Sequence, residues 1–149
     1  MGLRAGSEPT EKPFMLNRLM YASKTAEALN PASLQALLDH ARAANERRNI
    51  TGMLAFDSRW FLQVLAGDRH VVNEVFSRIA ADPRHRRVEL REVAATEERR
   101  FARWSVAFAA ADAPHRDLFL RWGKEPNFNP CEMTAPGALA LLSALAASA

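Results

Sequence analysis

The chain has 149 residues, of which 48% are hydrophobic and 25% are charged, so it can form one globular domain with a core but not two full domains. The net charge is +3, and the arginines are scattered rather than gathered in one tract, which argues against nucleic acid as a partner. Cys131 is the only cysteine, so no intrachain disulfide can form, and no apolar run approaches the roughly 20 residues of a membrane span. We therefore expect a cytoplasmic protein that binds neither nucleic acid nor membrane.

The first elements in chain order are a leader, a strand and a helix. Residues 1–14 lack the apolar core of a signal peptide and are predicted to form a flexible leader. Residues 16–23 alternate as a strand that carries Tyr21 on one face. Asn30, followed by proline, is predicted to cap a helix whose apolar stripe includes Asn45. Tyr21 and Asn45 are therefore expected to face the interior.

The segment 49–67 is the most informative part of the sequence, because it predicts two apolar strands joined by a polar turn. In the second strand, residues 60–65, Gln63 shares a face with Phe61 and Leu65, while three apolar side chains occupy the other face. Both faces are thus apolar, which is typical of a strand buried on both sides. A buried amide without partners would cost roughly 1–3 kcal/mol, so we expect a polar group to meet Gln63 inside the protein.

The next elements complete a compact sheet. Gly67-Asp68 is predicted to cap a second helix, which ends at Asp82-Pro83, and two strands follow near residues 88–93 and 102–108. The order β-α-β-β-α-β with one added strand is the ferredoxin-like pattern. We therefore predict an α+β fold with a five-stranded mixed sheet and two helices on one face.

Two further helices are predicted at the end of the chain. They span residues 113–123 and 137–147 and are separated by a loop with three prolines. The last helix presents Leu139, Leu142 and Leu145 on one side. It is too short to be stable alone, so we expect it to pack on the exposed sheet face or on a partner subunit.

Three polar side chains are predicted to point into the apolar interior from three different elements. Tyr21, Asn45 and Gln63 each have an ordinary structural explanation when taken singly, because buried polar groups usually bond backbone or reach solvent. Together they suit a planar heterocycle, since amides both donate and accept hydrogen bonds. The histidines lack metal-ligand spacing, and no nucleophile–base motif or phosphate-binding glycine loop is present. The apolar lining of such a heterocycle site is predicted to include Ile50, Leu65 and Ile79.

Five segments, in order along the chain, are 18–23 (RLMYAS), Asn45 with 49–52 (NITG), 60–67 (WFLQVLAG), 82–85 (DPRH) and 100–105 (RFARWS). Together they resemble the BLUF domains, which are flavin-binding blue-light sensors, and the order and spacing hold from about Leu16 to Phe108. The resemblance implies a ferredoxin-like domain at 15–110 that holds a flavin non-covalently between its two helices, followed by a helical extension at 111–149. The flavin is usually FAD, with FMN and riboflavin as alternatives.

The resemblance also implies roles for the central pair of residues. In that family, the tyrosine matching Tyr21 gives an electron to the photoexcited flavin, and a proton moves through the glutamine matching Gln63. The glutamine is left rearranged, with an altered hydrogen bond to the flavin. These roles suit the side chains, because a phenol is oxidisable and an amide carries both an acceptor oxygen and N–H donors.

The resemblance implies roles for four further residues, and this chain differs from the family at Val106. The asparagine matching Asn45 holds the polar edge of the flavin ring, and the residues matching Arg84 and His85 lie near the ring or its side chain. The tryptophan matching Trp104 is a mobile neighbour of the glutamine during signal output. Val106 stands where the family usually carries a methionine, and a β-branched valine cannot exchange with Trp104 as a flexible methionine could. Signal output or dark recovery is therefore expected to differ from the family pattern.

The sequence thus predicts a short blue-light photoreceptor that turns over no substrate and is not an enzyme. No recognisable effector domain follows residue 108, so we expect output through contacts with a downstream protein effector, and self-association into a homo-oligomer. One alternative is a light-insensitive interaction module of the same fold. RNA binding by a ferredoxin-like sheet is a weaker alternative, because no strand carries an aromatic RNP1-type motif.

Overall fold

The computed structural model describes residues 14–26, 30–57, 59–109 and 113–147. The predicted leader, apart from Phe14, lies outside these ranges. The elements are β2 (Leu16–Thr25), α1 (Pro31–Arg47), β3 (Thr51–Phe56), β4 (Trp60–Asp68), α2 (Arg69–Ala81), β5 (His85–Ala95), β6 (Trp104–Phe108), α3 (Ala113–Gly123), the 3-10 turn η1 (Pro130–Glu132) and α4 (Ala135–Ala147).

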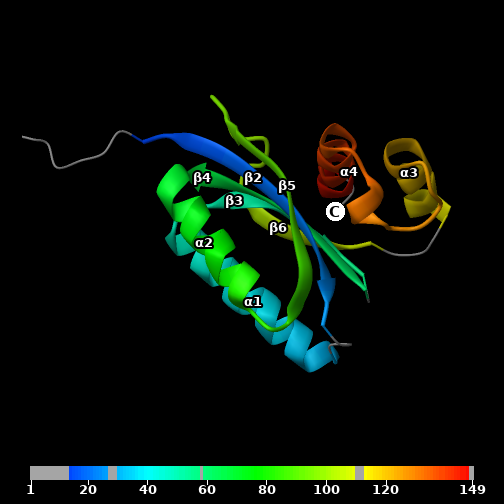
Figure 1. The fold of residues 1–149 in the computed structure, drawn as a ribbon, viewed down its shortest axis with the longest axis horizontal. Helices are drawn as coiled ribbons and strands as arrows, with labels where there is room; N and C mark the ends of the chain where they lie inside the picture. Colours follow the sequence, from blue (N-terminus) through cyan, green and yellow to red (C-terminus); the bar gives the residue numbers. More distant parts are fainter. Residues whose placement is uncertain (1–13, 27–29, 58, 110–112, 148–149) are drawn as a thin grey trace, which may run out of the picture.

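The strands form one five-stranded sheet in the order β5-β2-β4-β3-β6. All neighbouring pairs are antiparallel except β3 and β6, which are parallel. Helices α1 and α2 cover one face of the sheet, and α3 and α4 lie on the other side (Figure 1). The ferredoxin-like α+β fold with a mixed sheet is therefore confirmed.

The central strand β4 is buried on both sides, as the sequence predicts. Every residue of β4 from Trp60 to Gly67 is buried. Phe61 and Leu65 belong to the apolar cluster under α1 and α2, whereas Leu62 and Val64 belong to the cluster under α4. The strand therefore separates two cores, and Gln63 points into the first of them.

The starts of the two sheet-covering helices differ from each other. Asn30 caps α1 as predicted, because its side chain accepts a hydrogen bond from the Ser33 amide at 2.8 Å. Asp68 occupies the N-cap position of α2 but makes no side-chain cap bond. Its carboxylate instead accepts from the Met15 amide at 3.3 Å. Asp68 is therefore the N-cap residue, as predicted, but its side chain bonds the start of β2 and not the first turn of α2.

The last sheet strands also begin at positions that differ from the prediction. Strand β5 begins at His85 rather than near residue 88, because β2 runs on to Thr25 and Thr25 pairs with His85. Strand β6 begins at Trp104 rather than at Ala102, and Trp104 is its first residue paired with β3. The longer β5 brings His85 onto the sheet beside Tyr21.

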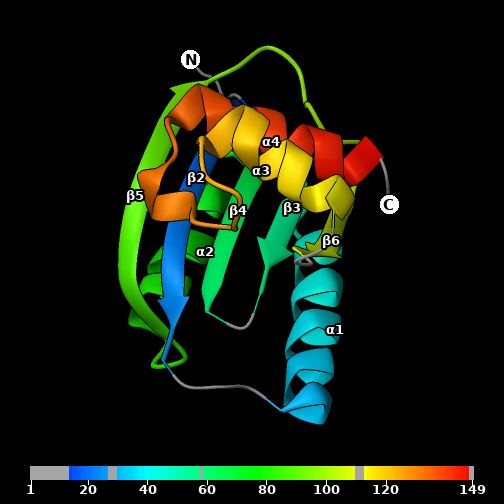
Figure 2. The ribbon, with the colours of Figure 1, turned by 90° about the vertical axis from the view of Figure 1, so that its right-hand side faces the viewer.

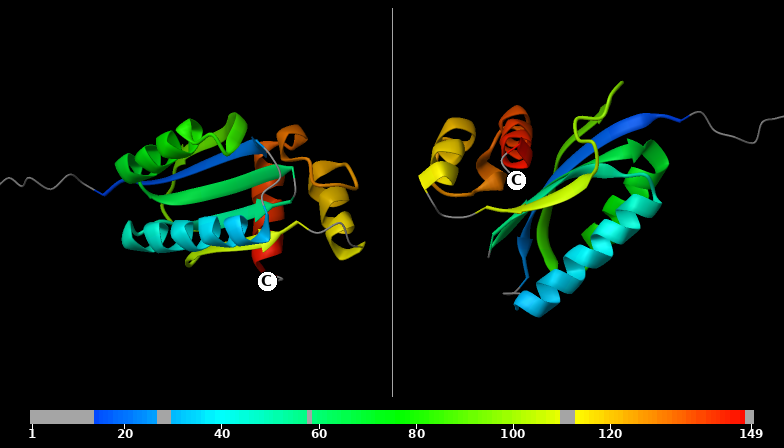
Figure 3. Two further views of the ribbon diagram at one scale, coloured as in Figure 1. Left: turned by 90° about the horizontal axis from the view of Figure 1, so that it is seen from below. Right: turned by 180° about the vertical axis from the view of Figure 1, so that it is seen from behind.

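The second face of the sheet is covered by α4. Leu141, Leu142 and Leu145 are almost fully buried and pack in one cluster with Leu62 and Val64 of β4. Figure 2 shows α4 lying across the strands, and in Figure 3 α3 and α4 (yellow and red) lie together on the side opposite α1 and α2 (cyan and green). None of the helices in the described ranges combines the length and the apolar content that crossing a bilayer requires.

Helix α4 begins two residues earlier than predicted, at Ala135. Its first turn is closed by Thr134, whose hydroxyl accepts from the Gly137 amide at 3.1 Å and whose carbonyl accepts from the Ala138 amide at 2.8 Å. Pro136 was predicted to belong to the preceding loop. A proline is tolerated there because the amides of the first helical turn have no intrahelical partner.

Candidate ligand-binding site

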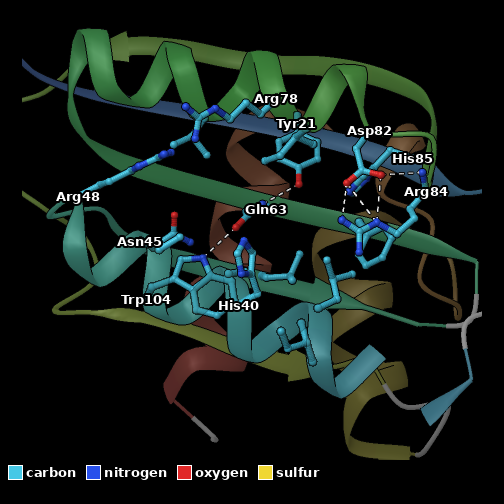
Figure 4. A pocket seen from close by; sticks show the side chains of 18 of the residues that line it. Tyr21, His40, Asn45, Arg48, Gln63, Arg78, Asp82, Arg84, His85 and Trp104 are labelled. Carbon is cyan, nitrogen blue, oxygen red and sulfur yellow. Dashed lines mark hydrogen bonds and ion pairs between the residues drawn. The ribbon is translucent and has the colours of Figure 1, made fainter. Parts of the chain in front are cut away.

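A cavity of about 400 Å³ lies between α1, α2 and the sheet face that carries Tyr21 and Gln63. Small-molecule pockets commonly measure about 300–1,000 Å³, so this cavity can hold a ring system of flavin size. Its inner wall is built from buried side chains, which include Leu54 and Phe61. Figure 4 shows Gln63 between Tyr21 and Trp104 at the centre of this wall.

A hydrogen-bonded chain of three buried side chains crosses the inner wall. Tyr21 and Gln63 are directly opposite in the antiparallel pairing of β2 with β4, so their side chains share a face. The Gln63 Nε2 donates to the Tyr21 Oη at 2.6 Å, and the Trp104 Nε1 donates to the Gln63 Oε1 at 2.8 Å. The polar partners expected for Gln63 are thus Tyr21 and Trp104.

Trp104 reaches Gln63 because β6 pairs with β3 in parallel, with Trp104 opposite Gly52. Gly52 has φ +157°, and a Cβ atom there would lie 2.0 Å from the Val64 carbonyl oxygen. No other residue fits at Gly52 without moving β3 away from β4. Glycine at this position therefore permits the close approach of β3, the strand that pairs with Trp104, to β4.

The indole of Trp104 determines the orientation of the Gln63 amide. An indole N–H can only donate, so the amide atom facing Trp104 must be the oxygen. The amide NH₂ group then faces Tyr21, and the Tyr21 oxygen is the acceptor. The amide can present its oxygen to Tyr21 only after the bond from Trp104 has been broken.

The Tyr21 hydroxyl is held in its neutral form. Burial raises the pKa of Tyr21 well above its usual value of 10.0, and the charge of Asp82 raises it further, while the bond from Gln63 lowers it. At neutral pH the phenol therefore carries its proton. Loss of an electron from this phenol requires a nearby acceptor for that proton.

One end of the cavity is formed by three residues around the start of β5. Asp82 and Arg84 form an ion pair at 2.6 Å, and the hydrogen bond from Arg84 lowers the pKa of the Asp82 carboxyl. His85 Nδ1 lies 2.8 Å from the Ser23 hydroxyl, and the His85 ring centroid lies 4.8 Å from that of Phe61. Burial lowers the pKa of His85, so its ring is neutral at pH 7.

The structure brings most of the predicted site residues to this one cavity. Ile50 and Leu65 do not line it, although both are buried in the apolar cluster beneath it. Asn49 has φ +57° and turns the chain after α1, and Ile50 then lies against Gly67. Val106 is half-buried against the same cluster and also lies outside the cavity wall. The predicted residues that do line the cavity are Tyr21, Asn45, Gln63, Ile79, Arg84, His85 and Trp104.

A basic rim was not anticipated from the sequence. Arg47 and Arg48 from the end of α1 and Arg78 from α2 line the cavity, together with His40. In the described part of the chain, the acidic residue that lines the cavity is Asp82, which is paired with Arg84. Figure 4 shows Arg48 and Arg78 at the end of the cavity away from Arg84. Helical spacing could have predicted Arg48 and Arg78. Arg48 lies on the same side of α1 as Ala41, and Arg78 on the same side of α2 as Val75.

The Asn45 side chain provides a direct test of whether a flat polar ligand fits. Asn45 is 5% exposed and lines the cavity, yet within the described residues its side-chain amide makes no hydrogen bond. Because Asn45 lines the cavity, its amide donor and acceptor are available to a ligand there. An isoalloxazine ring has imide N–H and carbonyl groups on one edge, and the apolar side chains of Leu38, Ile79 and Phe61 suit its remaining surface.

The fold and the site define a ferredoxin-like domain that binds a flat heterocyclic cofactor between two helices and a sheet. Residues 16–107 match the family described as BLUF, sensors of blue-light using FAD. This chain belongs to the BLUF family. It is a flavin-based blue-light sensor, which confirms the class of protein that the sequence predicts.

Known proteins similar to this chain carry the same domain in different settings. The chain is 38% identical to photoactivated adenylate cyclase subunit beta of Euglena gracilis over 74 residues. These residues make up 48% of this chain and 9% of that protein. The matched part of the chain spans less than a tenth of the length of the curated relatives that it matches. The photo-activated BlsA structure has a TM-score of 0.72 at 30% identity and covers 88% of this chain and 94% of BlsA. Klebsiella pneumoniae BlrP1 with FMN and cyclic diGMP has a TM-score of 0.59 at 34% identity, over 64% of this chain and 26% of BlrP1.

Proposed function

We propose that Tyr21 is the electron donor of this sensor and that Gln63 is its hydrogen-bond switch. The observation that carries the proposal is the buried chain from Trp104 through Gln63 to Tyr21 along the cavity wall. A bound flavin supplies a ring that absorbs blue light and becomes a strong oxidant when excited. Tyr21 offers an oxidisable phenol on this wall, and its oxygen contacts the Gln63 amide, which carries both N–H donors and an acceptor oxygen. The phenol proton can pass to the Gln63 oxygen only when that oxygen has left Trp104.

The rearrangement is a change of partners at Gln63. In the arrangement observed here, the Gln63 nitrogen donates to Tyr21 and the oxygen accepts from Trp104. Turning the amide over, or moving its proton, exchanges these roles and leaves the Trp104 N–H without its acceptor. Trp104 is therefore the side chain that carries the change from the cavity to β6.

The other cavity residues hold the ring rather than react. The unpaired amide of Asn45 suits the imide edge, and neutral His85 is fixed by the Ser23 hydroxyl. None of these roles consumes a substrate, so we propose a sensor that is not itself an enzyme. The relatives named as adenylate cyclase subunits contain this domain within much longer chains, which supports output through a downstream protein effector. Self-association into a homo-oligomer remains a prediction.

Absorption spectroscopy of the purified protein tests the function as a whole. Protein supplied with flavin is expected to bind it and to show a spectral shift under blue light that reverses in the dark. A colourless preparation after flavin supplementation would favour the light-insensitive interaction module. Bound flavin without a reversible shift would also refute the switch.

We further propose that the cofactor is a phosphorylated flavin, FMN or FAD, rather than riboflavin. Arg48 and Arg78 stand at the cavity rim, and a flavin phosphate would lie outside the apolar inner wall. Among the residues that the structure describes, Arg78 is engaged by an exposed ion pair with Glu74 at 3.8 Å, which an incoming phosphate can replace at little cost. BlrP1, one of the similar structures, holds FMN, which supports this choice.

The double variant Arg48→Gln/Arg78→Gln is expected to weaken FMN binding about tenfold and riboflavin binding less than twofold. Each exposed charge contact contributes up to about 1 kcal/mol, and salt screens it, so the difference should shrink as ionic strength rises. Fluorescence titration of the two flavins measures both constants. The variant Arg116→Gln/Arg121→Gln on α3 removes the same charge on the far side of the sheet and should change neither. Equal losses for FMN and riboflavin would refute a phosphate contact.

A further inference from the structure

We propose that Arg42 is a positioning residue that holds Trp104 against Gln63 in the dark-adapted protein. This inference rests on the proposed function, because it concerns the same rearrangement of Gln63. Arg42 lies on α1 and does not line the cavity. It therefore acts on the switch without touching the cofactor.

The geometry places a cation over the indole of Trp104. The guanidinium carbon of Arg42 lies 5.7 Å from the centroid of the Trp104 ring, within the distance of a cation–π interaction. An Arg42 Nη1 also lies 3.7 Å from the Asp39 carboxylate, one helical turn earlier. The side chain of Arg42 is thus held between an acidic neighbour on α1 and an aromatic ring on β6.

This contact bears on the orientation of the Gln63 amide. The Trp104 N–H bond to Gln63 keeps the amide oxygen away from Tyr21, so whatever stabilises the indole in place also stabilises this orientation. Trp104 is only 3% exposed, and its displacement would break both the hydrogen bond and the contact with Arg42. Arg42 therefore favours the arrangement observed here over one in which Trp104 has moved.

The neighbouring side chain on the strand gives Trp104 no comparable restraint within the described part of the chain. Val106 shares the face of β6 with Trp104, pairs with Leu54 of β3 and does not line the cavity. A valine has one strongly restricted torsion and cannot extend toward Gln63. Arg42 on α1 thus adds to the burial and hydrogen bond of Trp104 a restraint that Val106 does not supply.

The first test compares the dark recovery of Arg42→Gln with that of the unmodified protein. Loss of an exposed cation–π contact should slow the return of the spectral shift about two- to fivefold, since re-forming the Trp104–Gln63 bond loses its support. Arg42→Lys keeps the charge and should recover part of the rate. Arg121→Gln is the matched control, because Arg121 lies over Trp122 at 4.9 Å on α3, and it should recover at the unmodified rate.

The second test uses no bound flavin and isolates the position of Trp104. In a Trp60→Phe/Trp122→Phe background, Trp104 is the remaining tryptophan, and its fluorescence should be quenched by acrylamide about twofold more efficiently after Arg42→Gln. The role of Arg42 would be overturned if Arg42→Gln left the quenching of Trp104 unchanged. It would also be overturned if dark recovery of Arg42→Gln were unchanged or faster, or if Arg121→Gln altered dark recovery equally. Those results differ from failure of the proposed function, in which the unmodified protein itself shows no reversible shift.

Discussion

Tyr21→Phe is expected to abolish the reversible spectral shift while leaving flavin binding within about threefold of the unmodified protein. Phenylalanine keeps the ring that packs against Phe76 and His85, but it has no hydroxyl to lose a proton or to accept from Gln63. A phenyl ring is also much harder to oxidise than a phenol. Difference absorption spectra under blue light, with flavin content measured after denaturation, report both properties on one sample.

Ser23→Ala provides the matched control for this variant. It removes a different buried hydroxyl from the same face of β2, one that bonds His85 rather than Gln63. The shift should persist in Ser23→Ala. A normal shift in Tyr21→Phe would refute the role of Tyr21, and loss of the shift in both variants would show only that the cavity tolerates no hydroxyl loss.

Gln63→Leu is expected to abolish the shift and to lower the free energy of unfolding by about 2–4 kcal/mol. Leucine has a similar size, but it leaves the Trp104 N–H and the Tyr21 oxygen buried without the partner that both now share. Urea unfolding of the flavin-free proteins measures the loss of stability, and absorption spectra of the flavin-loaded proteins measure the loss of the shift.

An exposed glutamine gives the comparison for stability. Gln35 on α1 donates to Asp39 at 2.9 Å in an exposed setting, so Gln35→Leu should change the free energy of unfolding by no more than about 0.5 kcal/mol. If Gln63→Leu were as stable as Gln35→Leu, Tyr21 and Trp104 would have to find other partners. The hydrogen-bonded chain would then be dispensable to the fold.

Several features of the site were predictable because they depend on local periodicity. The alternation of residues 60–65 placed Gln63 on the face of Phe61, and the helical stripe of α1 placed Asn45 on its inner side. The capping of α1 by Asn30 was predictable for the same reason, since the cap and its partner Ser33 are three residues apart. The position of a cap can be predicted while its side-chain bond is not, as at Asp68, where the Met15 amide, distant in sequence, bonds the carboxylate.

The cavity wall was harder to predict, because its members come from separate elements. Ile50 has the apolar character expected of a lining residue, but the turn at Asn49 directs it toward Gly67. The rim arginines Arg48 and Arg78 resemble ordinary solvated charges until α1 and α2 lie over the same cavity. The family resemblance named Trp104 as a neighbour of Gln63, whereas residue patterns alone did not.

By itself, the sequence determined that this protein has a doubly buried strand with an amide inside it, and that Tyr21 and Asn45 face the same interior. These properties follow from the two-residue period of strands and the 3.6-residue period of helices, which operate over short stretches of chain. Only the tertiary structure decided that Trp104 donates to Gln63 and that Arg42 lies over Trp104. The physical reason is that these contacts depend on the parallel pairing of β6 with β3 and on the placement of α1 beside β6, which join residues that no local period relates.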